Sequence, residues 1–238
     1  APIPALSGRF FFFLFLAQPL ELTAALLYLK AIKISPLSLT VPFLSFTPVF
    51  LLFAGALFLG ETVTFLGVFG IGLVCGGSYV LYLEKGMGDI FLPLRSLFRE
   101  RGSLLMLLVS LIFSFTAPMG KRVIQESSPA VAMVSYRAMG ALIFTLYFMK
   151  KRCGLREPIK RYSALSPLVF IDVLHYIFHF GGIILVEVVY FISIKRLSIL
   201  ISLILGKLVF RETHFKLRLA GATVMLAGAA IIIFFGKI

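Results

Sequence analysis

Long apolar runs, separated by short polar segments, organise the whole chain. Eight such runs can be delimited, at residues 10–29, 36–60, 64–83, 103–119, 129–149, 162–184, 188–210 and 215–235. A helix of about 20 apolar residues is long enough to cross a hydrocarbon core of about 30 Å. The runs are continuously apolar and lack the alternation of transmembrane barrel strands. The pattern therefore predicts an all-α integral membrane protein with about eight transmembrane helices.

The composition agrees with this class. Of the 238 residues, 60% are hydrophobic and only 14% are charged, whereas soluble domains carry about 25% charged residues. A net charge of +13 would suggest a nucleic-acid partner in a soluble protein. Here cations beside the spans, facing anionic lipid head groups, account for it. We expect no nucleic-acid partner, and we expect a multi-pass protein of a prokaryotic inner or plasma membrane.

The basic residues are distributed unevenly between the two sets of connections. Fifteen lie in residues 30–35, 85–101, 150–161 and 211–218, and four lie in the opposite set, at Arg9, Lys121, Arg122 and Lys237. Cytoplasmic loops are enriched in Lys and Arg. The first set is therefore predicted to be cytoplasmic and both termini to lie outside.

A shift of 151 residues superimposes two parts of the chain. AGALFLGET at 54–62 then lies over LGKLVFRET at 205–213, Gly70 over Gly221 and Gly77 over Gly228. Repeats of this kind are typical of secondary transporters. We predict an incomplete first repeat of three spans (1–84), a basic connecting loop (85–102) and a second repeat of five spans (103–238). The expected architecture is a helical bundle of two five-helix repeats, from which the first two helices are missing in this chain.

A lysine and an arginine stand side by side in the apolar segment FISIKRLSIL at 191–200. The repeat lays Lys195 and Arg196 over Leu44 and Ser45, in the middle of a span. A charge at mid-bilayer costs about 2.5–3.5 kcal/mol, so the pair needs a reason to be there. Three interpretations stay open: contact with an anionic substrate, pairing with Glu187, Asp172 or Glu21, and a position in an interfacial loop.

A second polar cluster follows helical spacing in the run 162–184. Its members are Asp172, His175, Tyr176 and His179. Spacings of three, four and seven residues put them on one helix face. They fit hydrogen bonding to a substrate, proton relay through histidine, metal binding or a polar packing seam between helices. Since only one helix supplies the cluster, we expect no metal.

Gln18 and Glu21 share a face of the first run, on either side of Pro19. A proline frees backbone carbonyls in a helix, which can then line a cavity. Glu21 is interpreted as a proton site or as the counter-ion of Arg196. No arrangement of a nucleophile with a base and no phosphate loop is present, so we expect neither enzymatic activity nor a cofactor.

These motifs resemble the EamA-like permeases of the drug/metabolite transporter superfamily. The quoted motifs are PVFLLFAGALFLGE at 48–61 with glycines at 67, 70, 72, 76 and 77, and SIKRLSILISLILGKLVFRE at 193–212 with Gly221 and Gly228. The resemblance implies ten helices in two five-helix repeats. It also implies that Arg137, a position where the superfamily commonly has arginine, is an interfacial anchor.

A narrower resemblance concerns residues 193–202, SIKRLSILIS. The segment is similar to one in plastid triose-phosphate/phosphate translocators, where the Lys-Arg pair contacts the substrate phosphate. It implies that Lys195 and Arg196 contact an anion.

The function hypothesis is a secondary transporter that moves a small polar, anionic metabolite by alternating access. Asp172, His175, Tyr176, His179, Gln18 and Glu21 are expected to line its path, with proton coupling as one role. The alternative is a non-transporting membrane partner, or a truncated fragment of a transporter.

Overall fold

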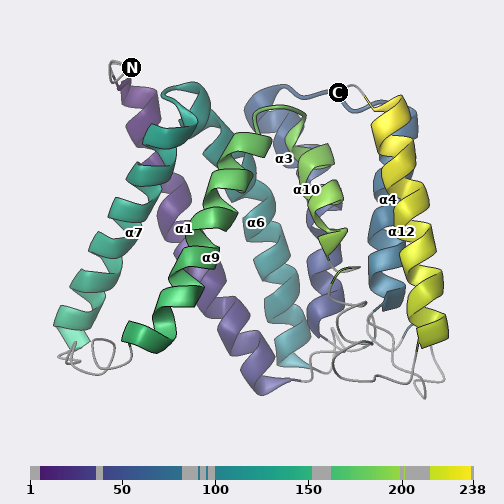
Figure 1. Cartoon of the computed structure of the whole chain (residues 1–238), viewed down its shortest axis with the longest axis horizontal. Helices are drawn as coiled ribbons and strands as arrows, with labels where there is room; N and C mark the ends of the chain where they lie inside the picture. Colours follow the sequence, from purple (N-terminus) through teal and green to yellow (C-terminus); the bar gives the residue numbers. More distant parts are fainter. Residues whose placement is uncertain are drawn as a thin grey trace. The chain divides into compact units, whose positions relative to one another are not determined.

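Helices make up the part of the chain that the structure describes. The structure is a computed structural model, and it describes residues 6–35, 40–81, 91, 95, 100–151, 162–198, 201 and 215–236. Its elements are α1 (Gly8–Ile34), the 3-10 helix η1 (Val41–Phe46), α3 (Thr47–Leu59), α4 (Phe65–Leu81), α6 (Arg101–Gln125), α7 (Pro129–Lys151), α9 (Tyr162–Gly182), α10 (Val188–Lys195) and α12 (Phe215–Phe235). Figure 1 shows this all-helical arrangement, and the predicted fold class is confirmed.

The predicted apolar runs coincide with these helices. Among the described residues, four stretches are long and apolar enough to cross a membrane: Gly8–Ile34, Val41–Leu59, Arg101–Gln125 and Pro129–Leu146. Shorter apolar helices cover Phe65–Val80, Val169–Gly182 and Leu219–Phe235. The chain is therefore a helical protein of the membrane-spanning type.

The predicted run 188–210 is wrong in one respect, because its helix does not pass through the Lys-Arg pair. α10 ends at Lys195 and residues 196–197 form a turn. The Arg196 amide donates to Ser193 O at 3.1 Å, and the Leu197 amide donates to Ile194 O at 2.9 Å. These bonds span three residues and tighten the last turn. Most of residues 199–214 lie outside the described part of the chain.

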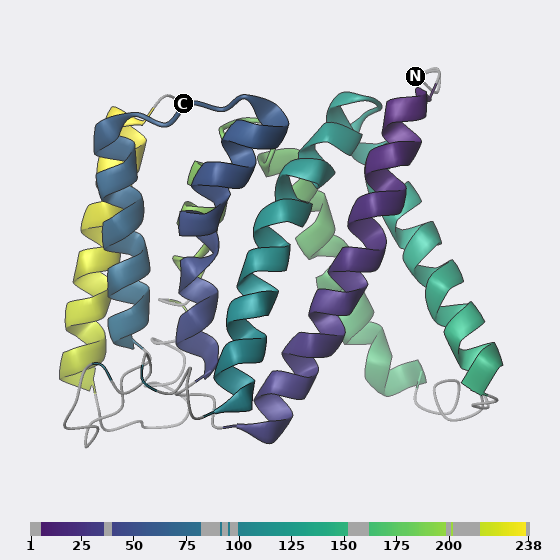
Figure 2. The same cartoon turned by 180° about the vertical axis from the view of Figure 1, so that it is seen from behind.

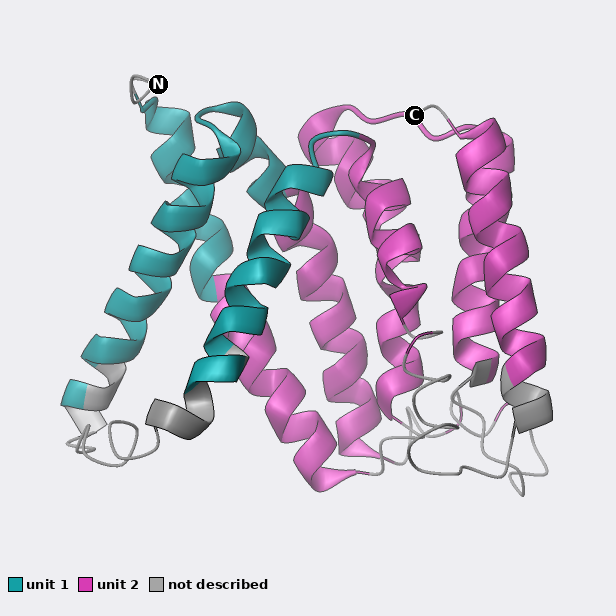
Figure 3. Ribbon diagram, in the orientation of Figure 1, with its two compact units in different colours: residues 1–19, 119–185 teal, residues 20–118, 186–238 magenta. Residues whose placement is uncertain are grey.

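Packing divides the chain into two compact units, which Figure 3 colours separately. Unit 1 comprises residues 1–19 and 119–185, and unit 2 comprises residues 20–118 and 186–238. α1 and α6 contribute to both units, and each is divided directly after a proline, Pro19 and Pro118. The units reflect packing and not sequence similarity, so the repeat boundaries given above stay a prediction.

Glycines bring α4 and α12 of unit 2 into close contact, and the two helices lie side by side in Figures 1 and 2. A Cβ at Gly70 would lie 2.8 Å from Gly228 O, and one at Gly77 would lie 2.6 Å from Gly221 O. The contacts run in antiparallel register. The 151-residue shift relates Gly70 to Gly221 and Gly77 to Gly228. Exchanging each glycine for its equivalent therefore turns the Gly70–Gly228 contact into the Gly77–Gly221 contact. The two equivalent helices therefore pack about a local two-fold axis.

The two halves of unit 2 also meet at the turn after α3. Gly60 ends this helix in the left-handed conformation, with φ of 69°, and its amide donates to Ala56 O at 3.0 Å. Glycine adopts this conformation without a steric penalty. The turn directs the Glu61 carboxylate to the first turn of α10, where it accepts a hydrogen bond from Val188 N at 2.9 Å.

A buried tyrosine holds three helices of unit 2 together beside this turn. The Tyr190 hydroxyl accepts a hydrogen bond from Thr64 N at 3.2 Å, and Thr64 Oγ1 donates to Phe235 O at 3.0 Å. Gly67 leaves room for the ring, since a Cβ there would lie 2.1 Å from the Tyr190 hydroxyl. One end of α10 is thus fixed against α4 and α12.

Unit 1 is built on the tight connection between α6 and α7. Ser128 caps α7 by accepting a hydrogen bond from Val131 N at 3.3 Å, and Pro129 occupies the first helical position, as is common. Tyr136 of α7 and Phe180 of α9 are both buried and pack edge to face at 5.4 Å. This contact positions the facing side chains of α7 and α9.

Candidate functional site

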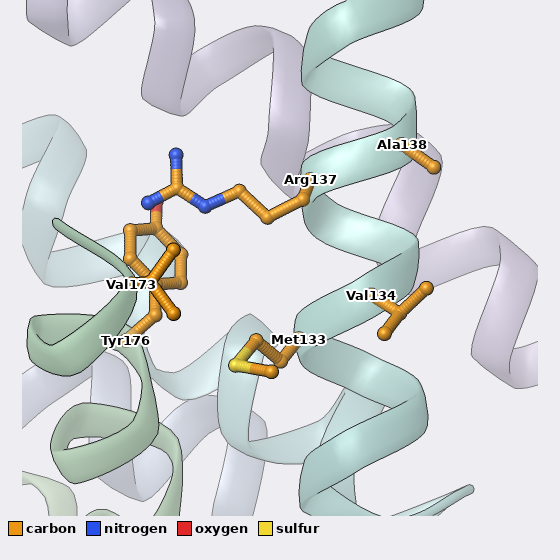
Figure 4. A pocket seen from close by; sticks show the side chains of 6 residues that line it. All are labelled: Met133, Val134, Arg137, Ala138, Val173 and Tyr176. Carbon is orange, nitrogen blue, oxygen red and sulfur yellow. The ribbon is translucent and has the colours of Figure 1, made fainter. Parts of the chain in front are cut away.

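The predicted stripe on α9 meets an arginine of α7 within unit 1. Arg137 Nη2 donates to Asp172 Oδ2 in an ion pair, and the guanidinium carbon lies 3.6 Å above the centre of the Tyr176 ring. Figure 4 shows the guanidinium stacked over this ring. A cation over an aromatic face gains electrostatic stabilisation in addition to the ion pair. Arg137, Asp172 and Tyr176 form the group called here the α7–α9 triad.

The two histidines extend the triad along α9. The His175 ring lies 5.7 Å from the Tyr176 ring and 5.8 Å from the His179 ring. The His179 ring in turn lies 5.8 Å from the Phe180 ring. The structure thus brings together all four residues of the stripe, as their spacing predicted. The use of the stripe by a substrate or by protons stays a prediction.

An open pocket of about 370 Å³ lies between α7 and α9, beside the triad. It is lined by Met133, Val134, Arg137, Ala138, Val173 and Tyr176. Figure 4 shows Met133 and Val173 on the same side of α7 as the guanidinium, and Val134 and Ala138 on its other side. The side chains of Arg137 and Asp172 are 43% and 47% exposed, and Arg137 is the member of the ion pair that lines this pocket. The volume falls within the range of about 300–1,000 Å³ for small-molecule pockets.

The interpretation of Arg137 as an interfacial anchor stays a prediction, and the structure adds a tertiary role for this residue. Arg137 lies eight residues into α7, which at about 1.5 Å per residue is roughly 12 Å from the beginning of the helix. Its guanidinium contacts α9 through Asp172 and Tyr176. The sequence signal that could have identified it is the presence of one cation and one carboxylate at mid-span in two different runs.

Gln18 is buried in unit 1, with 6% of its surface exposed. Among the described residues, its Oε1 atom has no hydrogen-bond partner. Gly140 of α7 leaves the space for this side chain, since a Cβ there would lie 2.8 Å from Gln18 Nε2. An acceptor left in this way is costly in an apolar interior. Gln18 is therefore suited to receive a hydrogen bond from a bound water or ligand.

The Lys-Arg pair lies in unit 2, at the end of α10. Arg196 is half-buried, and its Nη2 donates to Leu44 O at 2.9 Å and to Thr47 Oγ1 at 3.0 Å. Lys195 precedes it directly, and the charges of the Arg196 guanidinium and of the Glu21 carboxylate both act on its ammonium group. Asp172, one of the three carboxylates considered for this pair, instead binds Arg137 in unit 1.

Irregular helix geometry occurs at matching places in the two halves of unit 2. The 151-residue shift relates residues 196–197, where α10 gives way to a turn, to residues 45–46 at the end of η1. Leu44 lies in this 3-10 segment, and its carbonyl oxygen accepts the hydrogen bond from Arg196 Nη2. Discontinuous helices in corresponding positions typically surround the binding sites of transporters with internal repeats.

The neutral counterpart of Arg196 has a different environment. Ser45 is buried, with 3% exposure, and shares a hydrogen bond of 2.5 Å with Ser78 of α4. The first half therefore satisfies its polar side chain internally, whereas the second half presents a cation at the equivalent place. Among the described residues there is no group of three or more His, Cys, Asp or Glu placed to hold a metal ion.

Comparison with known proteins decides the class. A model of the EamA-like transporter family matches residues 2–83 and 100–234. The chain belongs to the EamA-like transporter family. Membership gives this EamA-like protein a transporter or permease function in a membrane, with a small molecule as its substrate. No match was found among curated proteins or among solved structures.

Proposed function

We propose that this EamA-like protein is a secondary transporter of a small polar, anionic metabolite, whose charge is contacted by Lys195 and Arg196. The observation that carries the proposal is the position of the Arg196 guanidinium. It lies at the break after α10 and donates to oxygens of the equivalent break in the first half. Binding sites of transporters with internal repeats are expected at such breaks.

An anion can compete for this guanidinium. The Leu44 carbonyl and the Thr47 hydroxyl are neutral acceptors, and hydrogen bonds from Arg to a charged oxygen are about twice as strong as bonds between neutral groups. The planar fork of Arg also fits carboxylate and phosphate in a bidentate manner. The ammonium of Lys195 adds a second positive charge next to it. The narrower resemblance to triose-phosphate/phosphate translocators supports the same role for the pair.

The other predicted residues are assigned to the transport path. Asp172, His175, Tyr176 and His179 provide polar groups along α9 in unit 1. Gln18 adds a buried acceptor in the same unit, and Glu21 acts on Lys195 in unit 2. Carboxylates and histidines in membrane spans commonly serve as proton sites in transporters. The proposed mechanism is alternating access, in which one half moves against the other so that the path opens to one side of the membrane at a time.

Binding by the purified protein tests the proposal. Thermal unfolding in detergent is followed with phosphate, sugar phosphates and small polar carboxylates without an apolar body as probes, and counterflow of the stabilising anion is measured in proteoliposomes. We expect an anion to raise the unfolding temperature of the native protein, and the variant Lys195→Ala/Arg196→Ala to lose this shift and the counterflow. Arg101→Ala, which removes an exposed cation at the beginning of α6, is the matched control.

Two results would contradict the proposal. Equal stabilisation of the native protein and the Lys195→Ala/Arg196→Ala variant would exclude the pair as the anion contact. Stabilisation by cations or neutral compounds alone would exclude an anionic substrate.

A further inference from the structure

The α7–α9 triad places a mid-span ion pair at the wall of an apolar pocket. Arg137 lines the pocket together with the apolar side chains of Met133 and Val173, and its guanidinium lies over the Tyr176 ring. Apolar pockets with one or two oriented charges are suited to ligands that carry one charged group on an apolar body. The pocket thus offers the Arg137 cation and apolar walls. The Asp172 carboxylate already forms an ion pair with this cation.

We propose that this pocket binds a small carboxylate with an apolar body, which replaces Asp172 on the Arg137 guanidinium as Asp172 takes up one proton. The inference goes beyond the proposed function, because it assigns a second anion contact, in unit 1, together with its ligand class and coupling ion. It rests on that function only where transport is concerned, because binding at this pocket can be measured by itself.

The exchange conserves charge. Before binding, the Asp172 carboxylate and the Arg137 guanidinium form a neutral pair. One carboxylate and one proton enter together. The ligand oxygen then accepts the hydrogen bond from Arg137 Nη2, and the proton resides on an Asp172 oxygen. The site again contains one cation and one anion in contact. Because no unpaired charge is created in the membrane interior, the large desolvation cost of a lone ion is avoided.

From α7, the charged side chain that contacts Asp172 is Arg137. On α9 itself, the titratable neighbours are His175, Tyr176 and His179, whose rings are in sequential contact. The α1 and α6 segments of unit 1 carry further charged groups, namely Arg9, Lys121, Arg122 and Glu126. Of these, Glu126 accepts a hydrogen bond from Ser7, and Arg122 donates to Gln125. The His175 ring lies 5.7 Å from the Tyr176 ring and 5.8 Å from the His179 ring, so three titratable side chains follow Asp172 along α9.

Calorimetric binding of hexanoate to the purified full chain tests the proposal. Three further compounds are compared with hexanoate. Butyrate has a shorter apolar body, hexanamide lacks the negative charge, and inorganic phosphate lacks the apolar body. We expect hexanoate to bind with the uptake of one proton, detected in buffers of different ionisation enthalpy. Because one proton is taken up with the ligand, the apparent Kd should fall by about tenfold for each unit by which the pH is lowered from 7.5 to 5.5. Hexanamide and phosphate should not bind at this pocket.

Variants of the two charged residues separate the roles. Asp172→Asn should bind hexanoate with a Kd that no longer depends on pH and without proton uptake. Arg137→Gln should lose binding by at least tenfold. Arg137→Gln/Asp172→Asn removes both charges, so it leaves no unpaired ion and shows whether the loss of binding reflects misfolding. Arg101→Ala, which removes an exposed cation at the beginning of α6, should keep pocket binding. The counterflow of Lys195→Ala/Arg196→Ala is measured separately, so failure here is distinguished from failure of the anion contact in unit 2.

Three outcomes would overturn the proposal. One is unchanged binding in Arg137→Gln, and another is binding without proton uptake in the native protein. The third is binding of oleate but not of hexanoate, which would identify the pocket as a site for membrane lipid and not for a soluble metabolite.

Discussion

Glu61 holds the first turn of α10 from a position 127 residues earlier in the chain. Both of its carboxylate oxygens accept from Val188 N, at 3.1 and 2.9 Å. The residue that precedes the helix, Glu187, makes no side-chain cap. A carboxylate at a helix N-terminus also interacts favourably with the helix dipole. In most helices the residue at the N-cap accepts this hydrogen bond, whereas here a distant glutamate accepts it.

Glu61→Ala is expected to destabilise the protein by about 0.5–2 kcal/mol, the range for the loss of an N-cap. This should appear as a lower unfolding temperature in detergent. Glu61→Gln keeps one acceptor oxygen and should lose less. Glu187→Ala is the matched control, and it should be neutral because the Glu187 side chain does not cap the helix. If Glu187→Ala destabilised as much as Glu61→Ala, the cap would not explain the effect.

The sequence identified single residues where local spacing was sufficient. Asp172, His175, Tyr176 and His179 share a face because of helical periodicity, and the structure brings them together. Periodicity could not identify the partner of Asp172, since Arg137 lies 35 residues away on another helix. The contact of Glu61 with α10 is likewise a product of tertiary packing.

At the scale of elements, the shared glycines of the repeat form a packing surface between equivalent helices. Gly70 and Gly77 of α4 contact Gly228 and Gly221 of α12, which brings the two backbones together. Small residues allow such close approach of membrane helices. The sequence repeat revealed that these glycines are equivalent. Only the structure shows that each contacts the counterpart of the other.

Gly77→Leu and Gly70→Leu are expected to abolish the close packing of α4 and α12. An added Cβ would already lie within 3 Å of backbone atoms of α12 at either position, and overpacking typically costs about 1–3 kcal/mol or more. We expect a large decrease in unfolding temperature and aggregation in size-exclusion chromatography. Gly72→Leu lies on the same helix with open space around it and should behave like the native protein. Normal behaviour of Gly77→Leu would contradict the antiparallel glycine contact.

At the same scale, the sequence predicted where helices lie but not where they break. Apolar content continues through residues 36–60 and 188–210. Hydrophobicity alone does not distinguish a 3-10 segment from an α-helix, because both bury the same side chains. The 3-10 geometry at Val41–Phe46 and the turn after Lys195 depend on bonds such as that from Arg196 to Leu44 O.

At the scale of the whole molecule, charge and hydrophobicity together predict how the chain is inserted. The class of the protein follows from its apolar runs and is supported by the family match over residues 2–83 and 100–234. The orientation follows from the 15 cations in one set of loops against four in the other. Cations resist translocation and stay in the cytoplasm, so both termini are predicted to lie outside.

The two native cysteines allow this orientation to be tested. Cys153 belongs to the basic loop that is predicted to be cytoplasmic, and Cys75 lies within α4. In intact cells that express Cys75→Ser, a membrane-impermeant maleimide should leave Cys153 unlabelled until the membrane is permeabilised. The variant Cys75→Ser/Cys153→Ser/Ser127→Cys places a thiol between α6 and α7, on the side predicted to face outward, and should be labelled without permeabilisation. Labelling of Cys153 but not of the thiol at position 127 in intact cells would show that the chain is inserted the other way round.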